Sequence, residues 1–546
     1  MINKPYEAII IGSGATGGVA ALTLAKAGIR VLIIERGPNL SLETAFGGEP
    51  TNTYRRICSL ITSKHKEQTQ HPGFWKSSPL LYATQKENPY STPDSAPFIW
   101  TQGHQVGGRS LTWGGITLRL SEKDMKASRK DGYGPEWPIN YSDLEPHYSS
   151  LERLFKIHGK KDGLEQLPDG EYIPPLPFTK SEEHFADKIK NNLGFSVIHS
   201  RGFGPYQTTN NMKWPRYSSL GSTIEIALKT GKVEILSNHI AEKLVLSKDK
   251  NSVKAVLTVD QKTGSRKLLK TKLVVICAST IQSIRLLLNS EEKSSPNGFI
   301  DPSGELGTKL MDHISTCRFF TLQNTSEGKI SNKKEVLSGA GSFFIPFGNN
   351  YEYNADFIRG YGIWGGIDRF EPPNWLKKKP STKTGFLIGH GEVLPYKDNK
   401  VTLSNEVDQF DIPIPHIDCK WKDNEKKMVM HMNKTIERTI SAGGGKMLPL
   451  KEIINFPFIN NILDKAIATR SESPPPGYYI HEVGGASIGS NKDSSVLDKW
   501  NRLWECKNVI VVDGASWPTS SWQSPTLTMM AITKRACENS IKDQKS

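Results

Sequence analysis

The clearest pattern along the chain is an alternation of short apolar runs with a glycine-rich turn and an alanine-rich stretch near its beginning. Residues 7–11 consist of Glu7 and a continuous apolar run of four residues, which is typical of a buried parallel strand. Residues 19–27 are rich in Ala and Leu and predict a helix, which Gly28 can end. A second apolar run over 31–34 predicts another buried strand. Together these segments predict a β-α-β unit of about 30 residues.

The turn of this unit carries three glycines in the pattern GxGxxG. We expect Gly12 to permit the tight turn, Gly14 to let a pyrophosphate approach the backbone, and Gly17 to let the helix pack close to the strand. The N-terminus of the helix then faces the anion. Glu35 follows about 20 residues later, where an acidic residue can hold ribose hydroxyls. The unit therefore predicts dinucleotide binding; the alternative is a glycine-rich turn without a ligand.

The rest of the chain continues the alternation of strands and helices. Strands are predicted over 233–236, 255–259 and 272–278, and helices over 141–155, 280–288 and about 424–441. The strand at 272–278 followed by the helix at 280–288 is a second strand-to-helix crossing of the doubly wound type.

Three other stretches are less regular. Residues 42–97 are polar and rich in Ser, Thr and Pro, and their pattern predicts no definite element. Residues 102–120 hold a second glycine cluster, which is typical either of close approach to a ligand or of a tightly packed turn. Aromatic residues recur between 330 and 470, and they could stack on a sugar ring or belong to the core: Trp364, Trp375 and Tyr396.

Composition narrows the class of protein. Of 546 residues, 36% are hydrophobic and 23% charged, which is ordinary for a globular chain and excludes disordered, collagen-like and small disulfide-rich proteins. The six cysteines include no Cys-x-x-Cys pair, so neither a zinc ribbon nor a dithiol motif is expected, and scattered thiols suit a reducing compartment.

Charge and targeting signals change the picture little. The net charge of +14 comes from 70 basic and 56 acidic residues, and the basic residues are scattered, so we expect no nucleic-acid partner. No apolar run reaches the ~18 residues of a membrane span, and no secretory signal pattern opens the chain. We therefore expect a cytoplasmic protein.

The C-terminal part of the chain resembles the closing motif of the GMC (glucose-methanol-choline) flavin oxidoreductases. The residues that carry this resemblance are His481-Glu482-Val483-Gly484-Gly485, the stretch 508–519 with Asp513-Gly514, and Ser524-Pro525-Thr526-Leu527-Thr528. Other segments of the chain are similar to the family in the same order: 6–37, 106–115, 275–288 and 304–313. Residues 399–403 and 411–413 resemble the sugar-acid and polyol dehydrogenase branch.

The resemblance implies an α/β fold. A doubly wound FAD-binding domain would carry an α+β substrate-binding domain built on an antiparallel sheet. By resemblance, the FAD-binding domain comprises residues 1–41, 98–128, 211–318 and 476–546. The substrate-binding domain comprises 129–210 and 319–475, and 42–97 form a polar lid or connection.

The resemblance also implies the contacts of FAD. Its pyrophosphate would meet Gly12, Gly14, Ala15, Thr16 and Gly17, its adenosine ribose Glu35, and its adenine Val233 or a neighbour. Its flavin and ribityl chain would run along Gly107, Gly108, Ser110, Thr112, Trp113, Gly114 and Gly115. Asp513 and Gly514 would close over the ribityl end, and Pro525 and Thr526 would lie near the pyrimidine edge. Thr112 stands where some relatives carry a histidine bonded covalently to FAD, so we expect non-covalent FAD.

The implied reaction is oxidation of a CH–OH group in a sugar, sugar acid, cyclitol or other polyol. His481 occupies the position of the family's base, and histidine suits that role because it accepts a proton near neutral pH. Ser524 falls where the family has His or Asn, and Gln523 could supply an amide if the loop shifted by one residue. Ser279 replaces the family's usual glycine.

Several alternatives stay open. The electron acceptor could be oxygen, as in an alcohol oxidase, or another external acceptor. A lyase on the same scaffold would use His481 and leave the flavin redox-idle. Besides the small-molecule alcohol, a second copy of the chain or an accessory electron-transfer subunit could be a partner.

Overall fold

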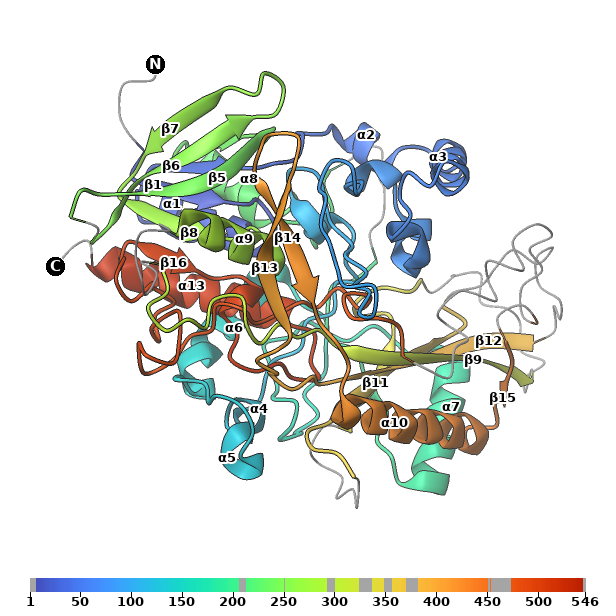
Figure 1. The fold of residues 1–546 in the computed structure, drawn as a ribbon. Helices are drawn as coiled ribbons and strands as arrows, with labels where there is room; N and C mark the ends of the chain where they lie inside the picture. Colours follow the sequence, from blue (N-terminus) through green and yellow to red (C-terminus); the bar gives the residue numbers. More distant parts are fainter. Residues whose placement is uncertain are drawn as a thin grey trace.

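A five-stranded parallel sheet forms one side of the molecule in the computed structural model (Figure 1). The structure describes residues 6–205, 213–249, 251–291, 300–323, 336–347, 356–369, 382–449, 452 and 473–543. The strand order is β16-β8-β1-β2-β4, and every neighbouring pair is parallel. The bounds are β1 (Ala8–Ile11), β2 (Val31–Ile34), β4 (Val233–Leu236), β8 (Leu273–Ile276) and β16 (Val509–Val511).

This sheet is covered on both faces, as its continuous apolar strands predict. Alternate residues of β1 enter two different cores: Ala8 and Ile10 join one, and Ile9 and Ile11 join the other. On the first face, α1 (Ala15–Lys26) packs against α8 (Thr223–Lys229) and α13 (Thr526–Asp543). On the second lie α9 (Thr280–Ser290) and a three-stranded sheet of β5 (His239–Leu246), β6 (Val253–Asp260) and β7 (Arg266–Lys270).

The predicted elements are confirmed. The structure has β1, α1 and β2 in the order expected, and α1 is followed by Gly28 with a positive φ of 88°. It also confirms α6 (Tyr141–Phe155), the pair β8 and α9, and α10 (Asp423–Ala442). The doubly wound parallel sheet is therefore the one that the sequence pattern predicts.

A six-stranded antiparallel sheet forms the other side of the molecule, in the order β15-β9-β12-β11-β10-β3. The bounds are β3 (Ile198–His199), β9 (Ile314–Gln323), β10 (Phe343–Ile345), β11 (Tyr361–Ile367), β12 (Thr382–Gly391) and β15 (Lys446–Met447). Helices α10 and α7 (Lys180–Leu193) cover one face of it (Figure 1). A Cβ atom at Gly389 would lie only 2.2 Å from the sulfur of Met432, so glycine there lets α10 approach β12 closely.

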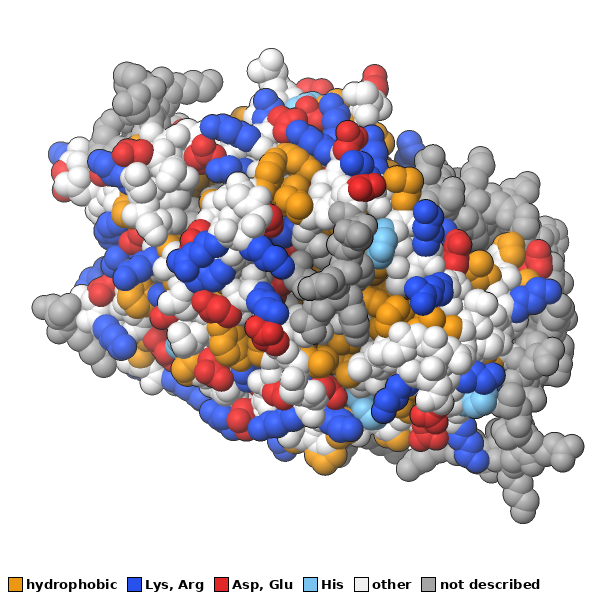
Figure 2. Space-filling model, turned by 90° about the horizontal axis from the view of Figure 1, so that it is seen from below, with side chains coloured by type: hydrophobic (Ala, Val, Ile, Leu, Met, Phe, Trp, Pro, Cys, Tyr) orange, Lys and Arg blue, Asp and Glu red, His pale blue; other side chains and the backbone are white. Residues whose placement is uncertain are grey.

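The polar stretch 42–97 contains α2 (Leu42–Phe46) and α3 (Glu49–Ile61), followed by the short 3-10 turns Gln68–Gln70, Pro72–Lys76 and Pro79–Leu81. The remaining elements are the 3-10 turns Gly108–Leu111 and Gly514–Ser516, α4 (Glu122–Met125), α5 (Ala127–Asp131), and the hairpin of β13 (Lys400–Val407) and β14 (Pro413–Asp418). In the described part of the chain, no helix is long and apolar enough to cross a bilayer. Figure 2 shows basic side chains interspersed with acidic ones over the face viewed there.

Candidate active site

A cavity of about 1900 Å³ lies between the parallel and the antiparallel sheet. Its lining runs from the carboxyl end of β1, through the glycine cluster near residue 108, to the strands β9, β11 and β12. Part of α3 and of the turns that follow it also line the cavity. One space therefore adjoins the GxGxxG turn, His481 and the antiparallel sheet.

The GxGxxG turn has the geometry of a pyrophosphate site. Gly12 has a φ of 99°, which a residue with a side chain rarely adopts. Gly14 caps α1 without a side chain, so the first N–H groups of the helix face the cavity beside Ala15 and Thr16. A Cβ atom at Gly14 would meet no protein atom within 4 Å, so the space above this glycine is free for a ligand. These residues fit a dinucleotide.

Glu35 lies at the carboxyl end of β2 and faces the same cavity. Its carboxylate accepts hydrogen bonds from the Ser13 backbone N–H (3.0 Å), the Ser13 hydroxyl (2.5 Å) and the Gly37 N–H (2.8 Å). Burial raises the pKa of Glu35, and these hydrogen bonds oppose that rise. The backbone turn and the acidic residue are thus fixed to each other.

Of the twenty residues predicted for the site, all but three line the cavity. The seventeen are Gly12, Gly14, Ala15, Thr16, Glu35, Gly108, Ser110, Thr112, Trp113, Gly114, Gly115, His481, Asp513, Gly514, Ser524, Pro525 and Thr526.

The three exceptions lie behind the cavity wall. A Cβ atom at Gly17 would lie 2.0 Å from the carbonyl oxygen of Gly12, so this glycine allows close helix–strand packing. Gly107 donates its N–H to the Ser13 hydroxyl (2.9 Å). Val233 stands at the amino end of β4 and packs in the core beside α1 and α8, far from the carboxyl edge that faces the cavity. The lining residues that follow β4 are instead 239–241.

At the other end of the cavity, two histidine rings meet. The Nδ1 atoms of His313 and His481 are 2.8 Å apart, and the Nε2 atom of His313 contacts the carbonyl oxygen of Ser521. A carbonyl only accepts, so Nε2 of His313 carries the proton. Burial lowers the pKa of His313 to about 4, so its ring is neutral and its Nδ1 accepts. His481 therefore donates from Nδ1, and its Nε2 is unprotonated.

The imidazole of His481 is held in its neutral form. Burial lowers its pKa well below the usual value, and the neighbouring His313, His390 and Arg109 lower it further. No hydrogen bond among the described residues engages its Nε2 atom. A neutral imidazole with one free lone pair thus faces the cavity.

The backbone around His481 is held by Asp312. This buried carboxylate accepts N–H bonds from His481 (2.9 Å), Gly477 (2.9 Å) and Tyr479 (3.3 Å). Burial and the nearby Glu482 raise the pKa of Asp312 to about 7, although the backbone N–H groups of His481, His313 and Gly477 favour its ionised form. One side chain therefore sets the path of residues 477–481.

Arg109 links the glycine cluster to the next residue of this segment. Its guanidinium lies 2.8 Å from the carboxylate of Glu482 and donates to the Ser279 hydroxyl (3.0 Å). Ser279 has a φ of 79° and a ψ of 145°, a conformation that glycine adopts far more readily. Ser279 therefore supplies a hydroxyl to Arg109 at the expense of backbone strain.

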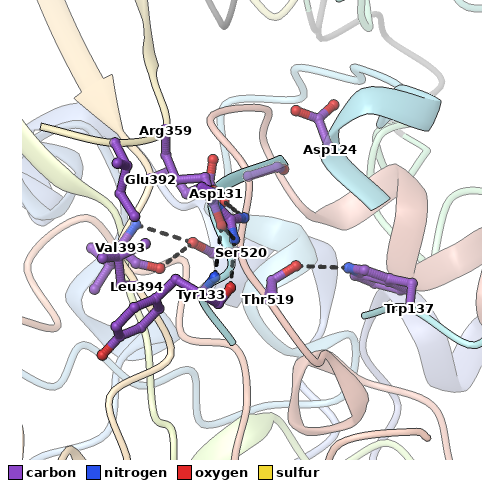
Figure 3. Close-up of polar contacts among 12 residues, drawn as sticks. Asp124, Asp131, Tyr133, Trp137, Arg359, Glu392, Val393, Leu394, Thr519 and Ser520 are labelled. Atoms are coloured by element: carbon purple, nitrogen blue, oxygen red, sulfur yellow. Dashed lines mark hydrogen bonds and ion pairs between the residues drawn. The ribbon is translucent and has the colours of Figure 1, made fainter. Parts of the chain in front are cut away.

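The loop 519–524, which ends at Ser524, is anchored on several sides (Figure 3). Trp137 donates its indole N–H to Thr519 (2.8 Å), and Ser520 exchanges hydrogen bonds with the backbone of Val393 (3.1 and 2.8 Å). Gln523 donates to Asp124 (2.7 Å) and does not line the cavity. The NH2 group of the Gln523 amide is thus already engaged, and Ser524 is the residue of this pair that faces the cavity.

Close behind this loop lies a buried charge network. Arg359 joins Asp131, the carbonyl of Tyr133 (2.9 Å) and Glu392 (2.8 Å) in the view of Figure 3. Burial raises the pKa of Glu392 to about 8, and Arg359 opposes the rise. Since Glu392 precedes Val393, the network fixes the strand end that holds Ser520.

Sequence reasoning missed three residues that lie around His481: Asp312, His313 and His390. The ring of His390 stacks on Tyr479, 5.3 Å away, and is buried. An alternation over 386, 388 and 390 would have placed His390 on one face of a strand, but no local signal reveals which face meets His481. Of the aromatic residues singled out, Trp364 lines the cavity, Tyr396 is buried outside it, and Trp375 lies outside the described residues.

Comparisons with known proteins agree with this geometry. Two sequence models of GMC oxidoreductases match the chain, one over residues 6–315 and one over 395–533. The chain is 24% identical to the 2-methyl-1,2-propanediol dehydrogenase of Mycolicibacterium austroafricanum, covering 97% of this chain and 94% of the relative. It is 23% identical to the fructose dehydrogenase large subunit of Gluconobacter japonicus, covering 99% and 98%.

Two solved structures share the fold. The pyridoxine 4-oxidase from Mesorbium loti has a TM-score of 0.61 at 15% identity, covering 98% of this chain and 99% of that one. The formate oxidase from Aspergillus oryzae RIB40 has a TM-score of 0.65 at 16% identity, covering 99% and 98%.

Proposed function

The chain belongs to the GMC oxidoreductase family, and from that premise we propose that it oxidises the CH–OH group of a small-molecule alcohol with FAD as cofactor. The observation that supports this most directly is the position of His481. Its free Nε2 faces the same cavity as the GxGxxG turn and Glu35. A proton acceptor and a dinucleotide cradle thus adjoin one space, as alcohol oxidation requires.

Two side chains of the protein act on the substrate hydroxyl: His481 as proton acceptor and Ser524 as a hydrogen-bonding group. His481 accepts the hydroxyl proton at Nε2 while its Nδ1–H stays bonded to His313. Bound FAD supplies the acceptor for the hydride that leaves the carbinol carbon. Ser524 lines the same space and orients the hydroxyl, since its Oγ can donate and accept. Thr112 lines the cavity and carries neither an imidazole nor a thiol that could bond to the flavin, which supports non-covalent FAD.

The names of the relatives and the branch resemblance bear on the substrate, the electron acceptor and a candidate accessory subunit. The branch resemblance favours a sugar, sugar acid, cyclitol or other polyol as substrate, and two relatives are named fructose dehydrogenase large subunit and gluconate 2-dehydrogenase flavoprotein. Other relatives are named oxidases, so oxygen stays a candidate acceptor. The name "large subunit" supports an accessory subunit as a candidate partner. The lyase alternative predicts carbon–carbon cleavage without any bleaching of the flavin.

The test is an anaerobic absorbance titration of the FAD-loaded protein with a panel of simple alcohols, polyols, sugars and aldonic acids. We expect at least one compound to bleach the oxidised flavin. The variant His481→Ala should keep FAD and slow flavin reduction by on the order of 10²–10⁴-fold. His158→Ala is the matched control, because its ring bonds the carbonyl of Pro174 outside the cavity. An unbleached flavin across the panel, or normal reduction in His481→Ala, contradicts the proposal.

A further inference from the structure

One face of the antiparallel sheet turns a continuous group of apolar side chains toward the cavity. We call Cys317, Phe319, Trp364, Phe386 and Ile388 the apolar wall; all five line the cavity. They are cross-strand neighbours, because Ile388 pairs with both Cys317 and Trp364, and Phe386 pairs with Phe319. Side chains paired in this way form one surface across β9, β12 and β11.

Much of this surface is left open to the cavity. Phe386 is 7% exposed, whereas the other four residues of the wall are only half-buried. The alternate residues of the same strands point the other way, toward α10, as shown by the bond between Tyr361 and His431 (2.9 Å). One face of the sheet is thus covered by α10, whereas the other leaves apolar surface open to the cavity. Such open apolar surface is typical of a binding surface rather than of a core.

Glycines shape the wall. On β11, the two residues that flank Trp364 on its own face are Gly362 and Gly366. A Cβ atom at Gly362 would lie 2.4 Å from the ring of Trp522, and one at Gly366 would lie 3.2 Å from the ring of Phe386. The large rings therefore sit in gaps left by glycine, which keeps the wall flat and fixes its side chains.

The wall offers few polar partners. The polar side chains among the lining residues from β9, β11, β12 and 336–339 are Ser315, Thr316, Ser338 and the indole of Trp364. Thr316 already bonds Asn433 and Ser338 already accepts from Gly341. These lining residues include no carboxylate, amide, Lys or Arg side chain within the part of the chain that the structure describes. The charged lining residues lie elsewhere: Glu35, Arg36, Arg109, Glu482 and Asp513 belong to the cofactor side, and Glu49, Arg56 and Lys76 to the stretch 42–97. A ring of hydroxyl groups laid on the wall would therefore find few hydrogen-bond partners.

The wall begins beside the base. The ring of Tyr479 lies 4.9 Å from that of His481 and 5.3 Å from that of His390, measured between ring centroids. His390 is two residues after Ile388 on the same face of β12. The apolar surface thus starts one aromatic layer away from His481.

We propose that the substrate is an alcohol with one reacting carbinol and an aryl or branched alkyl body, and not a polyhydroxylated sugar. The inference rests on the proposed oxidation of a CH–OH group, and it replaces the polyol that the branch resemblance favours with an apolar alcohol. The carbinol lies at Nε2 of His481, and the apolar body lies on the wall, where it displaces water from Trp364 and Ile388. A polyol placed there gives up hydrogen bonds to water at each hydroxyl and regains few.

The first experiment compares anaerobic flavin reduction in the holoenzyme by benzyl alcohol and cyclohexylmethanol with reduction by sorbitol and glucose. We expect kcat/KM to favour the apolar alcohols by on the order of 10²-fold, since an apolar pocket discriminates against added hydroxyls by about that factor. The tertiary alcohol 2-phenyl-2-propanol has no carbinol hydrogen to give up, and we expect it to inhibit competitively and to change the flavin absorbance on binding.

The second experiment tests the wall itself. Ile388→Thr places a hydroxyl on the wall and should lower the ratio of kcat/KM for benzyl alcohol over sorbitol by about 10-fold. Leu268→Thr is the control, because Leu268 is 54% exposed on β7 and does not line the cavity. FAD content and thermal stability confirm that both variants fold.

The outcomes separate the two proposals. Reduction by the polyols with higher kcat/KM, or an unchanged ratio in Ile388→Thr, overturns the apolar substrate and leaves the proposed function standing. Reduction by neither class overturns the proposed function. In that case, a saturable absorbance change with 2-phenyl-2-propanol still supports an apolar ligand at the wall, and its absence overturns the wall as well.

Discussion

The Nδ1 atom of His313 lies 2.8 Å from the Nδ1 atom of His481, although 168 positions separate the two residues. Because His313 donates from Nε2 to the carbonyl of Ser521, its Nδ1 is the acceptor in this pair. The bond therefore fixes the tautomer of His481 and leaves Nε2 free for a proton.

Removing the acceptor should weaken the base without removing it. In His313→Ala we expect flavin reduction at saturating substrate to slow by about 10–100-fold, the usual size of losing a group that orients an imidazole. His313→Asn should recover part of the rate, since its amide oxygen can accept from Nδ1 of His481. Stopped-flow reduction measures both rates, and FAD content serves as the check on folding. An unchanged rate and pH profile in His313→Ala would mean that the pair is only structural.

The pH dependence should report a histidine that resists protonation. His481 must be neutral to accept a proton, so the rate rises with pH through its pKa and is constant above it. Burial lowers this pKa, so the plateau should continue as the pH falls below 6.5, the ordinary value for histidine. The pH profile of kcat/KM measures this directly. An acid limb centred at or above 6.5 would contradict the buried neutral pair.

Ser524 should contribute one hydrogen bond to the reacting hydroxyl. Ser524→Ala should slow reduction by on the order of 10-fold, which corresponds to about 1.4 kcal/mol. Ser524→Asn restores a donor and acceptor at a position that lines the cavity, so we expect its rate to match or exceed that of the parent. Complete loss of reduction in Ser524→Asn, with FAD retained, would instead show that the serine has a role of its own.

Substituting Gly14 and substituting Gly17, two glycines of the GxGxxG turn, should affect different properties: FAD affinity in one case and stability in the other. Gly14→Ala places its Cβ where no protein atom lies within 4 Å, so the apoprotein should keep its stability while FAD binds at least about 10-fold more weakly. Gly17→Ala places its Cβ 2.0 Å from the Gly12 oxygen and should destabilise the fold by about 1–3 kcal/mol or more. Urea unfolding of the apoproteins and FAD titration separate the two effects. Equal loss of stability in both variants would refute this division.

The strained conformation of Ser279 gives a matched pair. Both Ser279→Ala and Ser279→Gly lose the hydroxyl that Arg109 contacts, but only glycine relieves the backbone at a φ of 79°. We therefore expect Ser279→Gly to be more stable than Ser279→Ala by about 1–2 kcal/mol in denaturant unfolding. Equal stability would show that the surrounding structure, rather than the side chain, determines this conformation.

The parts of the structure that the sequence predicts best are those decided locally. The unit from β1 to β2 follows from apolar runs, one glycine pattern and a terminal acidic residue, all within a single crossover. Helix α6 likewise follows from its own residues, with Asn140 and Asp143 forming a capping box at its start. Such elements need no information from distant parts of the chain.

The arrangement of residues around His481 could not be derived from local sequence in the same way. His481 was assigned through the family resemblance, because a single histidine between Ile480 and Glu482 has no pattern of its own. Its partner His313 follows a buried aspartate in a loop, and the bond between them depends on how the loop before β9 meets the segment 477–481. Val233 shows the converse case: the apolar pattern predicts the strand β4, but which residue in or after that strand reaches the cavity depends on the sheet edge.

The order of the strands in the parallel sheet has a consequence for how the protein is made. The central strand β1 pairs with β8, and β8 pairs with β16, which is synthesised more than 200 residues later. Asp513, Ser524 and Thr526, which complete the cavity, come later still. On the ribosome, the GxGxxG turn therefore emerges long before the residues that complete its cavity. Flavin should bind only after residues 509–526 have been synthesised and β16 has joined the sheet, and until then the edge of β8 stays unpaired in the nascent chain.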